Sequence, residues 1–154
     1  MSVPQLGLED FAIGQSYPGL PRRITAEDFN AFAALTGDSH PIHYDQAYAA
    51  KTRFGDCVAH GLLLTALGAL GATPLSARLE NCMVAMIEQG SSFRAPVFAG
   101  DTVQVVFTVQ RIERVPDGSK GRVRFAVTMR KSSGELVMEG FQTYLLAARQ
   151  AAAA

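Results

Sequence analysis

Two stretches in the second half of the chain alternate apolar and polar residues one by one. The apolar residues of the two stretches are Val103, Val105, Phe107 and Val109, then Val123, Phe125, Val127 and Met129. Successive side chains of a β-strand point to opposite faces of its sheet, so each stretch predicts a strand with one buried and one solvated face. The dipeptides Asp117-Gly118 and Ser133-Gly134 are typical of tight turns. With less regular strand candidates at 82–93 and 135–146, the second half predicts an antiparallel sheet.

The first half carries helix signals instead. Thr25 followed by Asp28 resembles a capping box, and Gly37 is placed to end the helix that begins there. Asp45 is placed to cap a second short helix over 46–53. A third helix is predicted from residue 60 onward, and because 62–72 is apolar on every side, we expect this helix to be long, buried and wrapped by other structure. The expected fold class is α+β, although several α+β folds share this order of elements.

The bulk composition limits both the architecture and the partners. The 154 residues fit one domain over 1–154, with an ordered core over about 13–146 and a tail at 151–154. Lys plus Arg and Asp plus Glu each number 14, so the formal net charge is zero. A chain without a basic excess is not expected to have nucleic acid as its main partner.

No segment is expected to cross a membrane or to direct secretion. The dense apolar part at 62–72 is much shorter than the roughly 20 residues that a membrane span requires. Residues 1–10 show no basic stretch followed by an apolar run. Cys57 and Cys82 are too few for a disulfide framework and too far apart for a paired motif. We therefore expect two buried, reduced thiols in a cytoplasmic protein.

The residues that point to chemistry lie in the loop between the first two predicted helices. Asp38 and His43 share this loop, and the rigid Pro41 lies between them. A carboxylate and an imidazole held together can move a proton onto one atom and off another. The spacing alone leaves a structural interpretation open, in which Asp38 caps a turn and His43 is a hydrogen-bonded structural histidine.

The same loop resembles the signature of the (R)-specific enoyl-CoA hydratases and MaoC-like dehydratases, which runs Gly-Asp-x-Asn-Pro-aliphatic-His-x-Asp. The chain matches this signature at Gly37, Asp38, Pro41, Ile42, His43 and Asp45. It departs at His40, where the family usually has Asn. The resemblance continues in 58–64 and 92–101 and covers about 13–146, and three separated motifs in the same order make it specific.

The resemblance implies a fold, a reaction and a set of roles. The fold is a hot-dog fold, an antiparallel sheet curled around a long buried central helix. The reaction is the (R)-specific, reversible hydration of a trans-2-enoyl-CoA to an (R)-3-hydroxyacyl-CoA. Asp38 and His43 would activate the water, and the backbone N–H of Gly61 would stabilise the developing oxyanion. No cofactor or metal is implied, since CoA is part of the substrate; acyl carrier protein is the alternative carrier, and a homodimer is the expected assembly.

Several further residues are candidates for binding the substrate. His60 and Leu62 flank Gly61, His40 occupies the usual Asn position, and Arg94 could contact CoA phosphates. Lys51 and Arg53 are alternatives to Arg94, and all three cations could equally be solvated surface charges. The three histidines could in principle bind a metal, but no H-E-x-x-H motif or paired Cys/His spacing supports a metal site.

Two other functions remain open at this point. A hot-dog acyl-CoA thioesterase also needs a carboxylate and an oxyanion donor, but such enzymes generally carry the acid on the central helix. The segment 58–77 contains no Asp or Glu. A non-catalytic acyl-thioester-binding subunit of the same fold would be expected to lose Asp38 or His43, and both are present.

Overall fold

The computed structural model describes residues 3–149. The predicted tail at 151–154 lies outside the described residues. Along the chain, short helices come first and four long strands follow. The elements are η1 (Leu8–Asp10), β1 (Ser16–Pro18), β2 (Arg22–Arg23), α1 (Ala26–Thr36), η2 (Pro41–His43), α2 (Gln46–Ala49), α3 (Gly61–Leu67), η3 (Leu70–Ala72), α4 (Leu75–Arg78), β3 (Met83–Phe93), β4 (Thr102–Arg114), β5 (Lys120–Lys131) and β6 (Leu136–Ala147).

The strands form one antiparallel sheet in the order β1-β4-β5-β6-β3, and β2 also pairs with β4. The four strands predicted from the sequence are confirmed. Gly118 and Gly134 lie at the predicted turns with φ angles of 71° and 91°, and Gly100 lies at the turn before β4 with φ of 98°, a backbone region that disfavours other residues. Strand β3 pairs only with β6 among the described residues, so it forms one edge of the sheet.

The first helix begins and ends as predicted. The Thr25 hydroxyl accepts from the Asp28 amide at 3.3 Å, and the Asp28 carboxylate accepts from the Thr25 amide at 2.9 Å. Gly37 ends α1 in the left-handed conformation, with φ of 77°. The second helix is shorter than predicted and ends at Ala49. Thr52 explains the early end, because its hydroxyl donates to the Ala49 carbonyl at 2.7 Å and competes with helical bonding.

The predicted long central helix is wrong in its length. Helix α3 ends at Leu67, and η3 and α4 follow as separate short pieces. Gly68 follows the helix, and its carbonyl accepts from the buried Gln142 side chain at 3.0 Å instead of from a further helical turn. The prediction that this helix is buried on every side is also wrong for the single chain, since Leu62 is 66% exposed.

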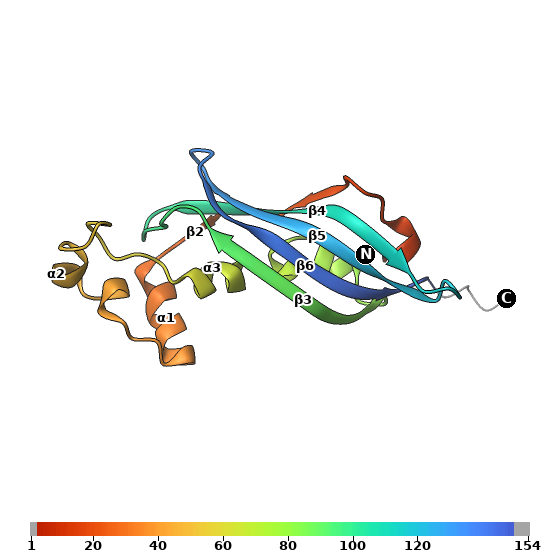
Figure 1. The fold of residues 1–154 in the computed structure, drawn as a ribbon, viewed down its shortest axis with the longest axis horizontal. Coiled ribbons are helices and arrows are strands. Elements are labelled where there is room, and N and C mark those ends of the chain that lie inside the picture. Colours follow the sequence, from red (N-terminus) through yellow and green to blue (C-terminus); the bar gives the residue numbers. More distant parts are fainter. Residues whose placement is uncertain (1–2, 150–154) are drawn as a thin grey trace.

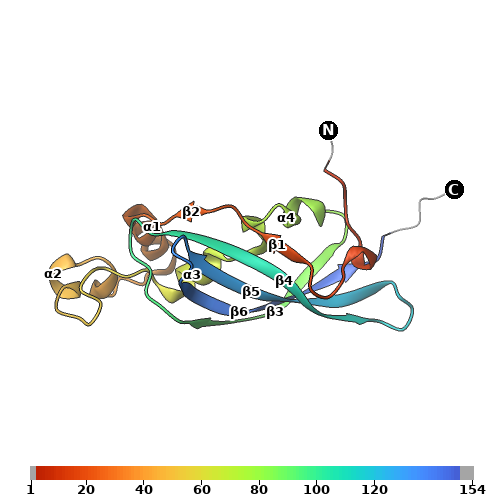
Figure 2. The ribbon, with the colours of Figure 1, turned by 90° about the horizontal axis from the view of Figure 1, so that it is seen from above.

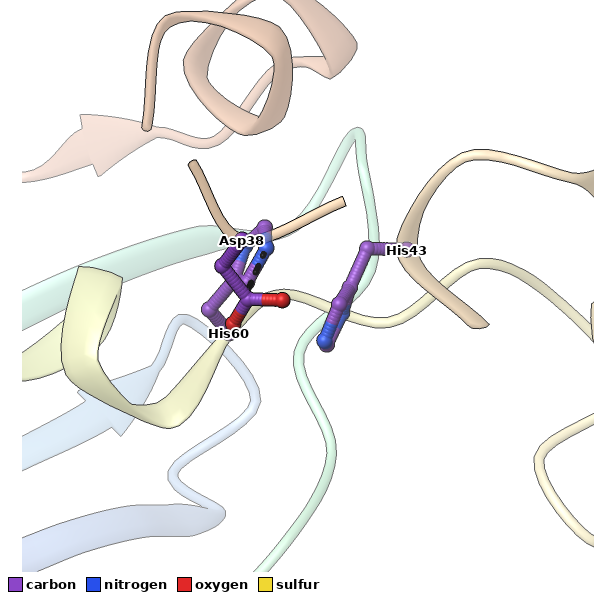
Figure 3. A group of neighbouring side chains, drawn as sticks. All are labelled: Asp38, His43 and His60. Atoms are coloured by element: carbon purple, nitrogen blue, oxygen red, sulfur yellow. Dashed lines mark ion pairs between the residues drawn. The ribbon is translucent and has the colours of Figure 1, made fainter. Parts of the chain in front are cut away.

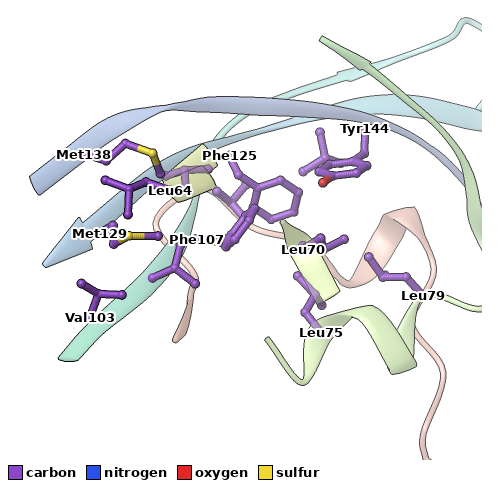
Figure 4. Packing of buried hydrophobic residues seen from close by; sticks show 14 of the residues in the cluster. Leu64, Leu70, Leu75, Leu79, Val103, Phe107, Phe125, Met129, Met138 and Tyr144 are labelled. Atoms are coloured by element: carbon purple, nitrogen blue, oxygen red, sulfur yellow. The ribbon is translucent and has the colours of Figure 1, made fainter. Parts of the chain in front are cut away.

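The core lies between these helical pieces and one face of the sheet (Figure 4). Phe125 is at its centre and packs edge-on against Phe107 and Phe11, with ring centroids 5.8 and 5.9 Å apart. Leu64, Leu70 and the other buried leucines of the helical pieces cover this face. The sheet curls over a short central helix, which is the predicted hot-dog arrangement with a broken helix.

The two kinds of structure are not spread evenly over the molecule. Figures 1 and 2 show α1 and α2 gathered at one end, beyond the sheet, while α3, η3 and α4 lie along one face of the sheet. The loop with Asp38 and His43 connects α1 to α2. The candidate site is therefore at the end of the sheet where α1, α2 and the start of α3 meet.

Candidate active site

The loop from Gly37 to Tyr44 is held by its own polar side chains. The Asp38 carboxylate accepts from the His40 amide at 3.3 Å, and His40 Nδ1 accepts from the Ile42 amide at 3.2 Å. Pro41 begins the 3₁₀ turn η2, where its missing N–H costs nothing. His40 therefore caps this turn with Nδ1, an atom bonded to Cγ just as the Oδ1 atom of an Asn would be.

His43 has one ring nitrogen engaged by the backbone. Its Nδ1 atom lies 2.6 Å from the carbonyl oxygen of Val58. A carbonyl oxygen can only accept, so Nδ1 carries the proton and Nε2 keeps a free lone pair. Val58 is itself fixed, because its amide donates to the Ile42 carbonyl at 3.3 Å and it forms an isolated bridge with Phe98. The imidazole is thus oriented as a base at Nε2.

The structure brings Asp38 and His43 together with His60 (Figure 3). One ligand atom of each of the three side chains lies within 4.8 Å of the other two. Asp38 Oδ2 is 3.9 Å from His60 Nε2, and the Asp38 side chain is 48% exposed. The carboxylate therefore faces solvent on one side and the two imidazoles on the other.

His60 is buried under His43. The two rings stack with centroids 3.7 Å apart and planes 25° apart, and Phe32 packs on His60 at 4.7 Å. Burial lowers the pKa of His60, and the neighbouring His43 lowers it further. His60 Nε2 lies 2.6 Å from the Tyr44 hydroxyl. A neutral His60 can therefore support the plane of His43 without adding a second positive charge.

Three such groups could also hold a metal ion in principle. Zinc needs imidazole lone pairs at about 2.0–2.1 Å. Here His60 Nε2 is hydrogen-bonded to Tyr44, whereas His43 Nε2 is free. The Tyr44 bond competes with a metal for one of the donor atoms, and a site without a metal stays a prediction.

Gly61 begins α3 next to His60. Among the described residues, no hydrogen-bond acceptor faces the Gly61 amide. A Cβ at this position would lie 2.7 Å from the Phe93 ring, so only glycine permits the close approach of Phe93. Gly61 also lines a cavity of about 240 Å³, together with Arg53, Phe54, Leu64, Phe93, Arg94 and Val97.

The other predicted substrate-binding residues differ in their positions. Arg94 lines the cavity, but its guanidinium pairs with Glu139 at 2.6 Å. Leu62 does not line the cavity. His40 is exposed and caps the turn. Arg53 lines the cavity and lies over the Phe54 ring at 4.7 Å.

A comparison with known protein families shows the family of this chain. The family described as the MaoC like domain matches residues 10–130. The chain belongs to this family. Its MaoC-like core therefore includes the loop from Gly37 to Tyr44, the start of α3 and the strands β3, β4 and nearly all of β5.

Named relatives of this MaoC-like chain are hydratases and dehydratases. A 3-hydroxybutyryl-CoA dehydratase of Methylorubrum extorquens is 37% identical over 88% of this chain and 80% of that protein. An (R)-specific enoyl-CoA hydratase of Rhodospirillum rubrum is 36% identical over 92% of both chains. The crystal structure of a MaoC-like dehydratase from Rhodospirillum rubrum superposes with a TM-score of 0.83 at 25% identity, over 95% of this chain and 99% of that one. The predicted family, the hot-dog fold and an enzyme of the hydro-lyase class are confirmed.

Two predictions outside the site can also be compared with the structure. Among the described residues, none of the helices is both long and apolar enough to pass through a membrane. Cys82 is buried, but Cys57 is only partly buried and its thiol lies 3.6 Å from Gln46 Oε1. The prediction of two buried thiols is therefore wrong for Cys57, and the cytoplasmic location stays a prediction.

Sequence reasoning missed one residue of this MaoC-like site. Tyr44 contacts both Asp38 and His60, yet no role was predicted for it. Its only sequence signal is its place directly after His43, at a position that the family signature leaves open. Nothing in the local sequence indicates that His60 would lie beside it.

Proposed function

We propose that this protein hydrates a trans-2-enoyl-CoA to an (R)-3-hydroxyacyl-CoA and catalyses the reverse dehydration. The observation that carries the proposal is the bond from His43 Nδ1 to the Val58 carbonyl, which leaves Nε2 free, on an imidazole with one ring nitrogen within 4.8 Å of an Asp38 carboxylate oxygen. The 36% identity to a protein named (R)-specific enoyl-CoA hydratase supports the same reaction. CoA is part of the substrate, so no further cofactor enters the proposal.

In this proposal, one water molecule binds between Asp38 and His43. One of the two groups takes a proton from the water as its oxygen adds to C3, and the proton taken up is then returned to C2, so the hydrogen and the hydroxyl of the water both end in the product. Both groups lie on the same side of the bound acyl chain, so hydrogen and hydroxyl add to the same face. Addition at C3 moves negative charge to the thioester oxygen, where the unpaired amide of Gly61 would donate a hydrogen bond.

The test is a hydration assay with crotonyl-CoA. We expect the absorbance of the conjugated enoyl thioester to fall without release of free thiol, and the product to be the (R) enantiomer. Asp38→Asn and His43→Ala should each reduce turnover by a factor of about 10²–10⁴, the usual contribution of acid/base groups. Asp117→Asn, in the distant hairpin turn, is the matched control. Normal turnover in either site variant would contradict the assignment.

The same assay separates the two alternative functions. A thioesterase would release free thiol from crotonyl-CoA, and a non-catalytic acyl-binding subunit would change neither signal. The thioesterase is disfavoured because α3 carries no acidic residue. Comparing CoA and acyl carrier protein thioesters of graded length would identify the carrier and the acyl chain. In the proposal, Arg53 and Arg94 contact the phosphates of the carrier at the cavity.

We further propose a homodimer in which the edge strands β3 of two copies pair. This edge carries four large apolar side chains that are about half exposed, Val84, Met86, Ile87 and Phe93. An exposed apolar edge strand favours pairing with another strand. Light scattering should give twice the mass of the chain, and Ile87→Lys should give a monomer. A wild-type protein that is monomeric at micromolar concentration would contradict the dimer.

A further inference from the structure

The Tyr44 hydroxyl contacts three groups from three parts of the site. It lies 2.6 Å from His60 Nε2, 2.8 Å from the carbonyl oxygen of Asp38 and 3.3 Å from the carbonyl oxygen of Phe29. Phe29 belongs to α1, Asp38 to the catalytic loop, and His60 caps α3. One phenol group therefore joins the elements that meet at the site.

The protons of this cluster can be assigned from the two short contacts. A hydroxyl has one proton to donate, and a carbonyl oxygen can only accept, so the proton between Tyr44 and Asp38 belongs to Tyr44. The proton in the contact of 2.6 Å must then come from His60 Nε2. The remaining nitrogen, His60 Nδ1, is buried without a partner. With this assignment, His60 Nδ1 carries a lone pair without a donor rather than an N–H without an acceptor.

The contacts of Tyr44 extend through His60 to His43. His43 stacks on His60 at 3.7 Å, and Phe32 covers His60 at 4.7 Å. Tyr44 therefore limits rotation of the His60 ring, on which His43 stacks. It also holds the backbone of Asp38. Burial raises the pKa of the Tyr44 hydroxyl, and the Asp38 charge raises it further, so Tyr44 keeps its hydroxyl proton at neutral pH.

We infer that Tyr44 is a positioning residue for the hydration reaction. Its hydroxyl fixes the Asp38 backbone and holds His60 in the Nε2-protonated, neutral form on which His43 rests. This inference depends on the proposed function, because Tyr44 acts only through Asp38 and His43. None of Tyr44, Asp38 and His43 lines the cavity beside Gly61, and Tyr44 contacts Asp38 and His60, so the expected effect of Tyr44 is on turnover rather than on binding in that cavity.

Tyr44→Phe is the direct test, since it removes the hydroxyl and keeps the ring that packs against the core. We expect kcat for crotonyl-CoA to fall about 10- to 100-fold, the usual effect of slightly misplaced catalytic groups. KM should change by less than about threefold, because the substrate cavity is intact. The matched control is Tyr17→Phe, which also loses one hydroxyl hydrogen bond, to Gln15 at 3.0 Å, but on β1. Its kcat should stay within about twofold of the wild type.

A second measurement does not depend on the folding of any variant. Nitrogen-15 NMR of the wild-type protein reports which nitrogen of His60 carries the proton, and we expect Nε2. A His60 protonated on Nδ1 would overturn the inference, as would a folded Tyr44→Phe with unchanged kcat or with the whole loss in KM.

The outcomes also separate this inference from the proposed function. If the wild type hydrates crotonyl-CoA and Tyr44→Phe equals it, only the role of Tyr44 is wrong. If the wild type hydrates no enoyl thioester, the proposed function fails and the role of Tyr44 in hydration fails with it.

Discussion

The sheet and the helical end of this molecule are stabilised in different ways. In the sheet, the inward side chains of β4 and β5 are almost completely buried, and Phe107 and Phe125 are 0% exposed. At the helical end, α1 buries only Phe29 and α2 buries only Ala49, while Leu35 is 85% exposed. Caps and side chain to backbone hydrogen bonds hold that end instead, as at Thr25, His40 and Tyr44.

This difference indicates that the sheet supplies most of the stability, whereas the helical end carries the candidate site. Strand alternation buries a continuous apolar face of the sheet, and this burial is the main source of stability there. The site lies where directional bonds dominate, and such bonds fix the orientation of a few side chains better than apolar contacts do.

The largest expected effect on stability belongs to the core of the sheet. Phe125→Ala removes the ring that Phe107, Phe11 and Tyr144 contact edge-on, and should lower the free energy of unfolding by about 3–5 kcal/mol. His43→Ala, in the site, should cost less than about 1.5 kcal/mol while nearly abolishing turnover. Urea unfolding of both variants measures the contrast. Equal losses of stability in the two variants would contradict this separation between the stabilising sheet and the helical end with the site.

A smaller effect is expected at the cap of α1. Thr25→Ala removes the acceptor for the Asp28 amide and should lower the free energy of unfolding by about 1 kcal/mol. Thr128→Ala, on the solvated face of β5, is the matched control and should change it by less than about 0.5 kcal/mol. Chemical denaturation checks both values. A Thr25 variant as stable as its control would show that capping contributes little to the helical end.

The pH dependence of stability should report the buried His60. Its pKa is lowered in the folded state, mainly by burial, so the unfolded chain binds a proton more readily. The contribution of His60 is complete above the ordinary histidine value of about 6.5 and is lost as pH falls from there toward the folded-state pKa. The unfolding free energy of His60→Gln should therefore decline less steeply over this range. Parallel pH curves for the two proteins would argue against a neutral, buried His60.

The smallest effect is expected at His40. In His40→Asn, the Asn Oδ1 atom can accept from the Ile42 amide in place of Nδ1, so turnover should stay within about threefold of the wild type. His40→Leu has no acceptor, and its turnover should be lower because the loop loses this bond. A large loss in His40→Asn would indicate that the imidazole itself takes part in binding or catalysis.

Much of the fold could be predicted from local patterns. The strands follow from alternation, and the start and end of α1 follow from Thr25, Asp28 and Gly37, because each signal lies within a few residues of the bond it makes. The Asp38–His43 loop was also found, because its residues are contiguous. The end of α3 was missed because Gly68 bonds to Gln142, which is distant in the sequence.

The rest of the site depends on tertiary contacts that no short pattern contains. Tyr44 was missed because its partner His60 arrives from another element. The sequence also does not show that the Val58 carbonyl would fix His43, since the contact depends on how 57–59 packs beside the loop. The exposure of Leu62 contradicts the expectation of a fully wrapped helix, because an apolar composition does not show which side of a helix faces the core.

The contact between Gly61 and Phe93 has a consequence for protein engineering. Phe93 is the last residue of the edge strand β3, and its ring packs directly on Gly61, a residue that lines the cavity. A substitution on this edge, such as one made to test the proposed dimer, is therefore expected to shift the ring and with it the backbone of Gly61. If the proposed dimer and the proposed role of Gly61 both hold, a change in assembly at this position also changes the reaction rate.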